Sequence, residues 1–263
     1  MDRYPAFRAG GTDGGTLPAF DGTVTYLADI SEYQPDITDA AYLAWSRAVV
    51  IRALYGATHD DAAWYGGARR AALHQGGAQF VGIYAYLIAS QTGAAQAQAF
   101  HQLVGPIQPG EVFIADFEEG DRTLLTGWYD EMLSLYGQSI APYLWTYTGL
   151  DFGQSQDVLP VQWLADYTNA EPAAPHTLWQ FSETYPVPGV GTADCSVFHG
   201  PITALAALAW QPFTPQEAPV TITTAPPGDW EGPVIVLGKG ADGNLYETKT
   251  SDGGKTWTVP VKQ

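Results

Sequence analysis

The 263-residue sequence has one cysteine, Cys195, and only 11 Lys or Arg residues against 28 Asp or Glu. A single cysteine excludes a disulfide framework within the chain and a zinc site built from cysteines. The formal net charge of −17 disfavours nucleic acid, which requires a basic surface, and an anionic membrane as partners. The five histidines are scattered and form no HExxH pattern. We therefore predict neither a metal nor any other cofactor.

Long apolar runs are also missing. No stretch reaches the ~20 apolar residues that a membrane span requires. The first 20 residues lack the apolar core of a secretory signal, so export through a cleaved signal peptide is not expected. Aromatic residues, in contrast, are abundant: nine Trp and fifteen Tyr exceed what a core needs. Such side chains are typical platforms for half-apolar ligands such as sugar rings.

The chain is predicted to have four parts. Its beginning is rich in glycine, and a later stretch rich in proline and threonine is typical of an extended linker. The segment after the linker repeats the pattern W-x-x-P-V, and its "TSDGGKTW" resembles the Asp-box turn of sialidase-like propellers, which is a structural motif. The predicted parts are an arm (1–22), a barrel (23–210), the linker (211–229) and a small β-hairpin or meander for interaction or attachment (230–263).

The barrel is predicted from an alternation of apolar strands and helices, which indicates a parallel sheet covered by helices. The second half keeps the strands and loses most helices, so we predict an α/β fold: an irregular, TIM-like eight-stranded β/α barrel. The predicted strands are 25–31, 48–54, 80–88, 111–118, 141–148, 161–167, 176–182 and 194–200. The predicted helices are 38–48, 60–76, 92–104, 122–137 and 203–210.

Chemistry-bearing side chains gather at the predicted strand ends. The carboxyl ends of barrel strands meet at one rim, which is where the chemistry of such folds resides. The residues predicted at this rim are Asp29, Arg52, Tyr86, Asp116, Glu118, Trp145, Tyr147, Asp166 and Gln180, with Asp194 where the eighth strand begins or its loop ends.

Asp116 and Glu118 are the central pair of this rim. They are two positions apart on a predicted strand, so they share a face with their Cα atoms about 6.6 Å apart. Two like charges at this distance raise one pKa, and one acid stays protonated beside one that is ionised. Glycoside hydrolysis requires such a pair. Glu119 and Asp121 are each expected to be a surface charge or a helix N-terminal acid.

Each rim residue also has a structural interpretation. Asp116 and Glu118 alone suit a solvated turn, Asp29 suits a cap, and Asp166 suits an ion pair with Arg52. Trp145, Trp163 and Trp179 are, one by one, more typical of a core. The joint placement of the acids favours a functional site.

In these residues the chain resembles glycoside hydrolase family 25, the lysozymes that cut peptidoglycan between N-acetylmuramic acid and N-acetylglucosamine. The resemblance covers roughly residues 24–200 and implies an eight-stranded barrel with incomplete helices. Its motifs occur in the family's order: "DISEYQ", "VVIRALYG", "VGIYAY", "FIADFE", "LWTYT", "WLADYT", "LWQFS" and "VPGVGTADCSVF".

The resemblance implies roles for the rim residues. Glu118 matches the general acid/base, and Asp116 matches the carboxylate that attacks the anomeric carbon or steadies an intermediate formed by the substrate's acetamido group. Asp29 and Asp194 match two further acids that tune the pair. The substrate-contacting candidates are Tyr86, Trp145, Tyr147, Asp166, Gln180, Arg52 and Trp179.

Two motifs depart from the family. Tyr84-Ala85-Tyr86 stands where Tyr-His-Phe is usual, which suggests that the rim lacks a histidine, and Asp194-Cys195-Ser196 replaces Asp-x-Asn. These departures leave open an alternative: a weakly active or inactive glycan-binding or structural protein on a lysozyme-like barrel.

The missing signal peptide suggests how the protein reaches a cell wall. We expect a bacteriophage product, either part of the virion tail, with other tail proteins contacting the arm and the C-terminal repeat, or an endolysin released by a holin at host lysis. The Gly-rich arm and the short repeat favour the tail component.

Overall fold

The computed structural model describes residues 23–34, 39–150, 152, 162–167, 171–212, 234–239, 245–250 and 261–262. The chain divides into two compact units, residues 1–211 and 212–263, which we describe separately. The predicted arm, residues 213–229 of the predicted linker, and the Asp-box-like turn after Thr250 lie outside the described residues.

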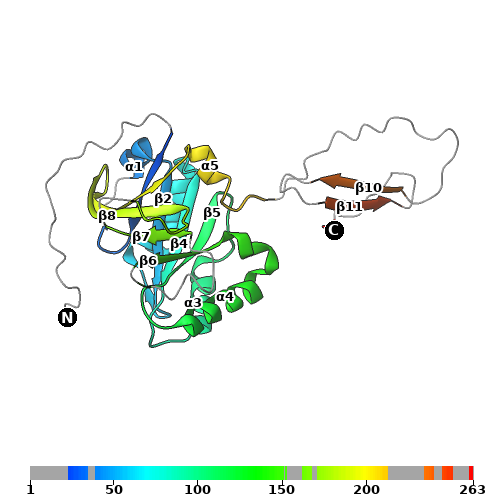
Figure 1. Cartoon of the computed structure of the whole chain (residues 1–263), viewed down its shortest axis with the longest axis horizontal. Coiled ribbons are helices and arrows are strands. Elements are labelled where there is room, and N and C mark those ends of the chain that lie inside the picture. Colours follow the sequence, from blue (N-terminus) through cyan, green and yellow to red (C-terminus); the bar gives the residue numbers. More distant parts are fainter. Residues whose placement is uncertain are drawn as a thin grey trace. The chain divides into compact units, whose positions relative to one another are not determined.

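The first unit is a closed barrel (Figure 1). Its strands are joined in the order β1-β9-β8-β7-β6-β5-β4-β2, and pairing of β1 with β2 closes the ring. A two-residue strand, β3 (His59–Asp60), pairs with the end of β2. The barrel strands are β1 (Thr25–Ile30), β2 (Ala48–Tyr55), β4 (Phe80–Tyr86), β5 (Glu111–Asp116), β6 (Leu144–Gly149), β7 (Trp163–Ala165), β8 (Leu178–Val187) and β9 (Gly191–Phe198).

Most helices lie in the first half of the chain, and none of the described residues between β6 and β9 is helical. The predicted irregular β/α barrel is therefore confirmed, although several element boundaries differ. Residues 62–67 form a 3-10 helix before α2, and a 3-10 helix replaces the start of the strand predicted at 141. The helices are α1 (Asp39–Trp45), η1 (Ala62–Gly67), α2 (Ala68–Gln75), α3 (Gly93–Val104), α4 (Arg122–Tyr136), η2 (Gln138–Tyr143) and α5 (Ile202–Ala206).

The last strand differs from the prediction of a parallel sheet. β9 runs antiparallel to both β8 and β1, while the other barrel pairs are parallel. A parallel connection needs a crossover of a dozen or more residues, and only three residues separate β8 from β9. Gly189 and Gly191 supply the left-handed φ values of 77° and 97° in this tight turn. Asp194 consequently lies within β9, opposite Asp29 of β1, and not at a strand end.

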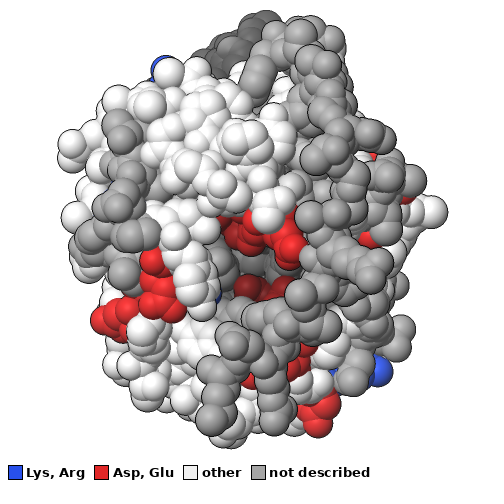
Figure 2. All heavy atoms as spheres, turned by 90° about the vertical axis from the view of Figure 1, so that its left-hand side faces the viewer, with Lys and Arg blue, Asp and Glu red and all other residues white. Residues whose placement is uncertain are grey.

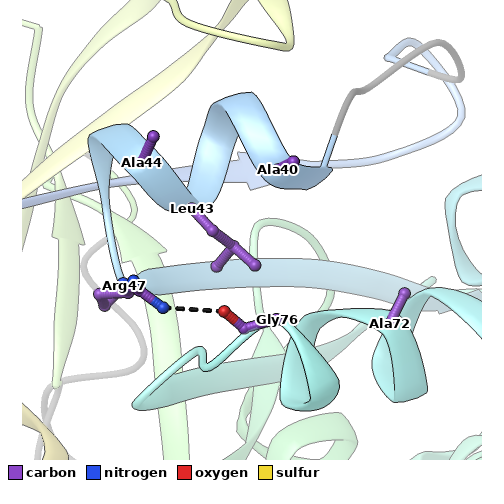
Figure 3. Close-up of a pocket in the computed structure, with 6 residues that line it drawn as sticks. All are labelled: Ala40, Leu43, Ala44, Arg47, Ala72 and Gly76. Atoms are coloured by element: carbon purple, nitrogen blue, oxygen red, sulfur yellow. Dashed lines mark hydrogen bonds between the residues drawn. The ribbon is translucent and has the colours of Figure 1, made fainter.

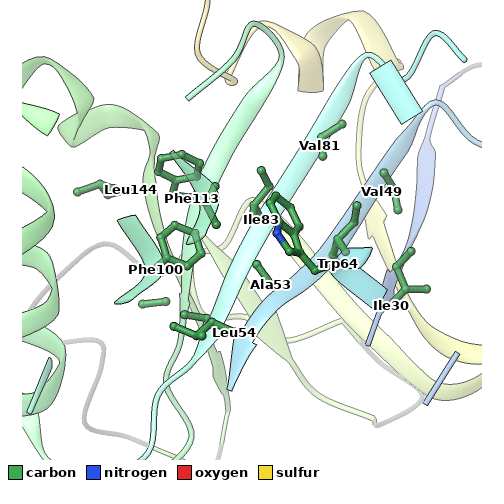
Figure 4. Packing of buried hydrophobic residues seen from close by; sticks show 14 of the residues in the cluster. Ile30, Val49, Ala53, Leu54, Trp64, Val81, Ile83, Phe100, Phe113 and Leu144 are labelled. Atoms are coloured by element: carbon green, nitrogen blue, oxygen red, sulfur yellow. The ribbon is translucent and has the colours of Figure 1, made fainter. Parts of the chain in front are cut away.

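Apolar side chains fill both faces of the barrel wall. Alternate residues point inward, where Val50, Phe80 and Ile114 belong to a core inside the barrel. The intervening residues point outward and pack with side chains from the helices, such as Phe100 of α3 (Figure 4). This alternation, interrupted by a register shift in β2, determines which strand-end residues face the mouth of the barrel.

An ion pair is buried where β5 begins. Glu111 has no exposed surface, and its carboxylate accepts two hydrogen bonds from Arg70 of α2, at 2.7 and 2.6 Å. It also accepts one from the backbone N–H of Gln108 at 2.7 Å, and Nε2 of His74 lies 2.7 Å from the same carboxylate. The cluster therefore joins α2 to the strand that carries the central acids.

Helices α3 and α4 lie side by side (Figure 1) and touch through their backbones at Gly93. A Cβ atom at Gly93 would lie 1.9 Å from the carbonyl oxygen of Leu124 and 2.4 Å from the backbone N of Trp128.

We expect Gly93→Ala to lower the free energy of unfolding by about 1–3 kcal/mol, because the helices must separate. Gly127→Ala is the matched control: its Cβ would meet nothing closer than 3.6 Å, so helix propensity should stabilise the protein by about 0.5–1 kcal/mol. Urea unfolding of both variants tests this prediction. A change in the free energy of unfolding with the same sign in both variants would contradict it.

The second unit contains β10 (Val234–Lys239), β11 (Leu245–Thr250) and β12 (Val261–Lys262). They form a three-stranded antiparallel sheet in chain order. The residues between β10 and β11 lie outside the described part of the chain. Across the described part of both units, no helix is long and apolar enough to cross a membrane.

Candidate active site

The mouth of the barrel brings together the four acids predicted from the sequence. Asp29 and Asp194 are cross-strand partners on β1 and β9, and Asp116 ends β5. The charge of Glu118 acts on all three of the others, which places the four in one electrostatic group. Figure 2 shows a face of the molecule on which acidic side chains gather around a hollow.

Glu118 lies beyond the strand that was predicted to contain it. β5 ends at Asp116, but the backbone N–H of Phe117 still donates to the carbonyl of Tyr147 on β6 at 3.0 Å. Phe117 is fully buried in the outer core, so the in–out alternation continues for two residues past the strand. Glu118 is consequently on the same side as Asp116, half-buried at the mouth.

Asp116 is a buried acid whose pKa is strongly shifted. It is 7% exposed, and burial, followed by the negative charge of Glu118, raises its pKa well above the ordinary carboxyl value, while Arg52 opposes the shift. None of the described residues hydrogen-bonds to its buried Oδ1. The two carboxyl groups are therefore electrostatically coupled, and the charge of Glu118 favours the protonated form of Asp116.

Asp29 and Asp194 form a second carboxyl pair. Burial raises the pKa of Asp29 to about 6. Burial and the charge of Asp29 raise the pKa of Asp194 to about 9, and the two side chains share a hydrogen bond. Near neutral pH, Asp194 is therefore the protonated donor and Asp29 the ionised acceptor.

Gln180 of β8 connects this second pair to the tyrosines of the mouth. Its Nε2 donates to Oδ2 of Asp29 at 2.8 Å. Its Oε1 accepts from the hydroxyls of Tyr147 and Tyr167, each at 2.7 Å. Gln180 is 1% exposed, so it acts on Asp29 and offers little surface to a ligand. This differs from its predicted role as a substrate contact.

Arg52 on β2 is held by two acids. It forms ion pairs with Asp61 and with Glu32, the latter at 3.1 Å. The predicted alternative of a pair between Arg52 and Asp166 is not the one found. His59 completes the cluster, with Nε2 3.1 Å from the second oxygen of Glu32.

Three other substrate-contact candidates occupy different environments. Trp145 is 3% exposed and packs on Phe80 inside the barrel, below the mouth. Trp179 packs with Phe181 on the outer face, and its indole N–H donates to the carbonyl of Asp166 at 2.8 Å. Both tryptophans are thus packing residues in this fold. Asp166 follows β7 and is half-buried beside Tyr167.

The acids next to the central pair bind the backbone, and the predicted helix N-terminal role is confirmed for Asp121. Glu119 accepts a hydrogen bond from the N–H of Ala89 at 2.9 Å. Asp121 caps α4 by accepting from the N–H of Thr123 at 2.9 Å.

The structure adds two tyrosines, Tyr84 and Tyr167, to the predicted site, and it shows where the position of the missing histidine lies. Tyr84 is buried inside the barrel. Burial is the largest cause of its raised pKa, and the charges of Asp29 and Asp116 raise the pKa further. Alternation from Tyr86 on β4 would have found Tyr84, and Tyr167 directly follows Asp166. Ala85, where the family has histidine, points into the outer core, so its identity removes no group from the mouth.

The other features that could indicate a site carry less chemistry. A cavity of about 420 Å³ lies between α1 and α2, lined by Ala40, Leu43, Ala44, Arg47, Ala72 and Gly76 (Figure 3). It contains neither an acid nor a nucleophile. Cys195 is fully buried on the outer face. Among the described residues, no group of three or more His, Cys, Asp or Glu side chains is arranged to hold a metal ion.

The raised pKa values predict how stability depends on pH. A carboxyl with a raised folded-state pKa binds protons more tightly in the folded chain, so its stabilisation is present at low pH and is lost as pH rises. For Asp194 the window runs from the ordinary value of 3.8 to about 9. We expect the melting temperature to fall as pH rises through this window, and Asp194→Asn to flatten the fall. Asp130→Asn, which removes an exposed acid, should leave the slope unchanged; parallel melting curves for all three proteins would contradict the assignment.

A barrel mouth that gathers four coupled carboxyl groups, with tyrosines around them, is typical of the site of a glycoside hydrolase. The comparisons with known proteins agree. The family model for glycosyl hydrolases family 25 matches residues 28–190, and the chain belongs to this family. It is accordingly a glycoside hydrolase of the lysozyme type.

Solved structures of the same fold include proteins from fungi, bacteria and a phage. A family 25 lysozyme from Aspergillus fumigatus is 22% identical, with 72% of this chain and all of that chain covered, at a TM-score of 0.58. A muramidase from Trichobolus zukalii is 26% identical over 70% of this chain and 98% of that one, at 0.57. The catalytic domain of an endolysin from Listeria bacteriophage P40 is 18% identical over 70% and 97%, at 0.56. None of the curated proteins compared with the chain matches it.

Proposed function

We propose that the chain is an endo-N-acetylmuramidase that cleaves the β-1,4 bond between N-acetylmuramic acid and N-acetylglucosamine in bacterial peptidoglycan. The observation that carries the proposal is the Asp116 and Glu118 pair on the inward side of β5, backed by the hydrogen-bonded pair Asp29 and Asp194. The bond and the substrate are those of the family's lysozymes.

Glu118 is proposed as the general acid and Asp116 as the carboxylate beside the anomeric carbon. In this proposal the coupled pair holds one proton. As positive charge develops on the sugar, it favours the negative charge on the buried Asp116 and leaves the proton on Glu118, which passes it to the leaving oxygen. Glu118 is the more exposed of the two, so it can then take a proton from the incoming water. Asp116 either bonds to the anomeric carbon or steadies the intermediate formed by the substrate's acetamido group.

Digestion of purified cell walls tests the proposal. The wild-type protein should release new reducing ends, and mass analysis of the products should show N-acetylmuramic acid at each of them. N-acetylglucosamine at the reducing ends would identify a glucosaminidase, and a wall left intact would remove the hydrolytic proposal.

We expect Gln180→Ala to lower kcat about ten-fold or more with a smaller change in KM, because Gln180 orients Asp29 without facing the substrate. Its hydrogen bond also lowers the pKa of Asp29, so the acidic limb of the pH–activity profile should move to higher pH. A change confined to KM would instead make Gln180 a substrate contact.

The alternative of a weakly active or inactive glycan-binding protein loses part of its support. It was motivated by the missing histidine, and Ala85 faces the outer core. Saturable binding of glycan without any cleavage after long incubation would still select it.

The biological setting is also a proposal: a bacteriophage protein of the virion tail, with tail proteins contacting the N-terminal arm and the C-terminal repeat. A separate strand-rich second unit and a fold shared with a phage endolysin domain are consistent with it. Detection in purified particles would support the tail assignment. Presence only in the lysate of infected cells would select the holin-released endolysin.

A further inference from the structure

A β-bulge next to the acids reorients one side chain of β2. Arg52 of β2 pairs with Tyr84 of β4, but the register then shifts, so that Leu54 pairs with Ala85 and Tyr55 with Tyr86. Ala53 and Leu54 both point into the outer core as a result. Without the extra residue, Tyr55 would point outward; with it, Tyr55 turns to the side of the mouth. Bulges that re-aim a side chain are a recurrent device beside active sites.

The reoriented Tyr55 stacks on Tyr86. Their ring centroids are 4.9 Å apart and the rings are inclined by only 7°. Tyr86 is in turn the cross-strand partner of Asp116, the buried acid of the central pair. The stack therefore stands directly beside the proposed catalytic carboxylates.

Arg52 fixes a third ring near this stack. Its guanidinium carbon lies 5.6 Å from the ring centroid of Tyr33 and 5.7 Å from that of Tyr55. Arg52 cannot swing away, because it is 6% exposed and pairs with Asp61 and Glu32. We call Tyr33, Tyr55 and Tyr86 the tyrosine wall.

Two of the three rings of the tyrosine wall are exposed to solvent. Tyr33 is 78% exposed and Tyr55 40%. Five large hydrophobic side chains of the described residues are exposed. Three of them contact residues of the mouth: Tyr33 lies on Arg52, Tyr55 stacks on Tyr86, and Tyr167 donates to Gln180. Such clustering marks a binding surface better than scattered exposure does.

We propose that the tyrosine wall is a sugar-binding subsite that stacks a pyranose ring of the glycan strand, beyond the two sugars whose bond is cut. The inference rests on the proposed muramidase function and adds a specificity determinant to it. Aromatic faces suit the apolar side of a sugar ring, while Glu32 and His59 supply polar atoms for its hydroxyls. Because Arg52 and the stack hold the rings in place, binding costs little side-chain entropy.

The test compares Tyr33→Ala and Tyr55→Ala with the wild type on peptide-free glycan strands, a tetrasaccharide and an octasaccharide. Each variant should raise KM for the octasaccharide roughly three- to ten-fold, as expected for the loss of one stacking contact, and leave kcat close to the wild-type value. The tetrasaccharide should respond less. Leu208→Ala, which removes an exposed apolar side chain from the segment after α5, should behave as the wild type. Melting temperatures confirm that each variant is folded.

Glycan binding by a catalytically inactive variant tests this inference separately from the proposed function. In the Glu118→Gln background, calorimetric titration with the octasaccharide should show a Kd raised by a similar factor when Tyr33→Ala or Tyr55→Ala is added. If the wild type cleaves both strands and neither KM nor Kd changes in the tyrosine variants, the subsite is wrong and the muramidase proposal stands. If the wild type cleaves nothing, the muramidase proposal fails, and the titration still decides whether the wall binds glycan.

Discussion

Glu118→Gln is expected to lower kcat on bacterial cell walls by about 10²–10⁴-fold, the usual contribution of a general acid. Glutamine keeps the size of the half-buried side chain but has no proton to give to the leaving oxygen. KM should change much less, because the amide can still contact the substrate. The measurement is the initial rate of reducing-end release, corrected for the folded fraction of each protein.

The neighbouring acid provides the matched control. Glu119→Gln removes the same charge one residue away, and its amide oxygen can still accept from the N–H of Ala89. This variant should retain most of the wild-type rate. Equal losses in both variants would mean that net charge at the mouth matters and that Glu118 has no specific role.

Glu111→Gln is expected to lower the free energy of unfolding by about 3–5 kcal/mol, the cost of breaking a buried ion pair by removing one partner. The amide keeps the volume of the side chain, but the buried guanidinium of Arg70 loses its counter-charge and both of its hydrogen bonds to a carboxylate. Urea unfolding at neutral pH, monitored by tryptophan fluorescence, gives the value.

Glu131→Gln is the control for this prediction. Glu131 accepts one hydrogen bond from Gln98 at the surface of α4, so the change should stay within about 0.5 kcal/mol. A Glu111→Gln variant that is as stable as Glu131→Gln would show that the cluster can be satisfied without its charge.

Alternation along each strand explains why the site acids could be predicted. Asp29 and Asp116 end apolar strands on the inward phase, and the phase continues to Glu118 although the strand does not. The same rule assigns Trp179 to the outer face, since its neighbour Gln180 points inward. Types and phases of residues are local properties, and local patterns record them well.

Other features depend on contacts that no local pattern contains. Ala53 and Leu54 are both apolar, so nothing in their sequence marks the bulge that turns Tyr55 to the mouth. The depth of Trp145 follows from the stagger of neighbouring strands, which places it on Phe80. The antiparallel course of β9 was likewise missed, because the predicted strands 176–182 and 194–200 leave a longer connection. In the structure β8 extends to Val187 and β9 begins at Gly191, and the three residues between them are too few for a crossover.

The way β9 closes the barrel has a consequence for folding. β9 lies between β8, its neighbour in the chain, and β1. Thr25 at the start of the first barrel strand therefore pairs with Phe198 at the end of the last one. Contacts between residues so far apart in sequence form late and slow folding. During synthesis β1 can pair with β2, but its other edge must wait for β9, and Asp29 has no Asp194 until then. Ring closure and completion of the second acid pair are therefore one event, so a nascent chain that stops before Asp194 would have neither a sealed barrel nor a finished site.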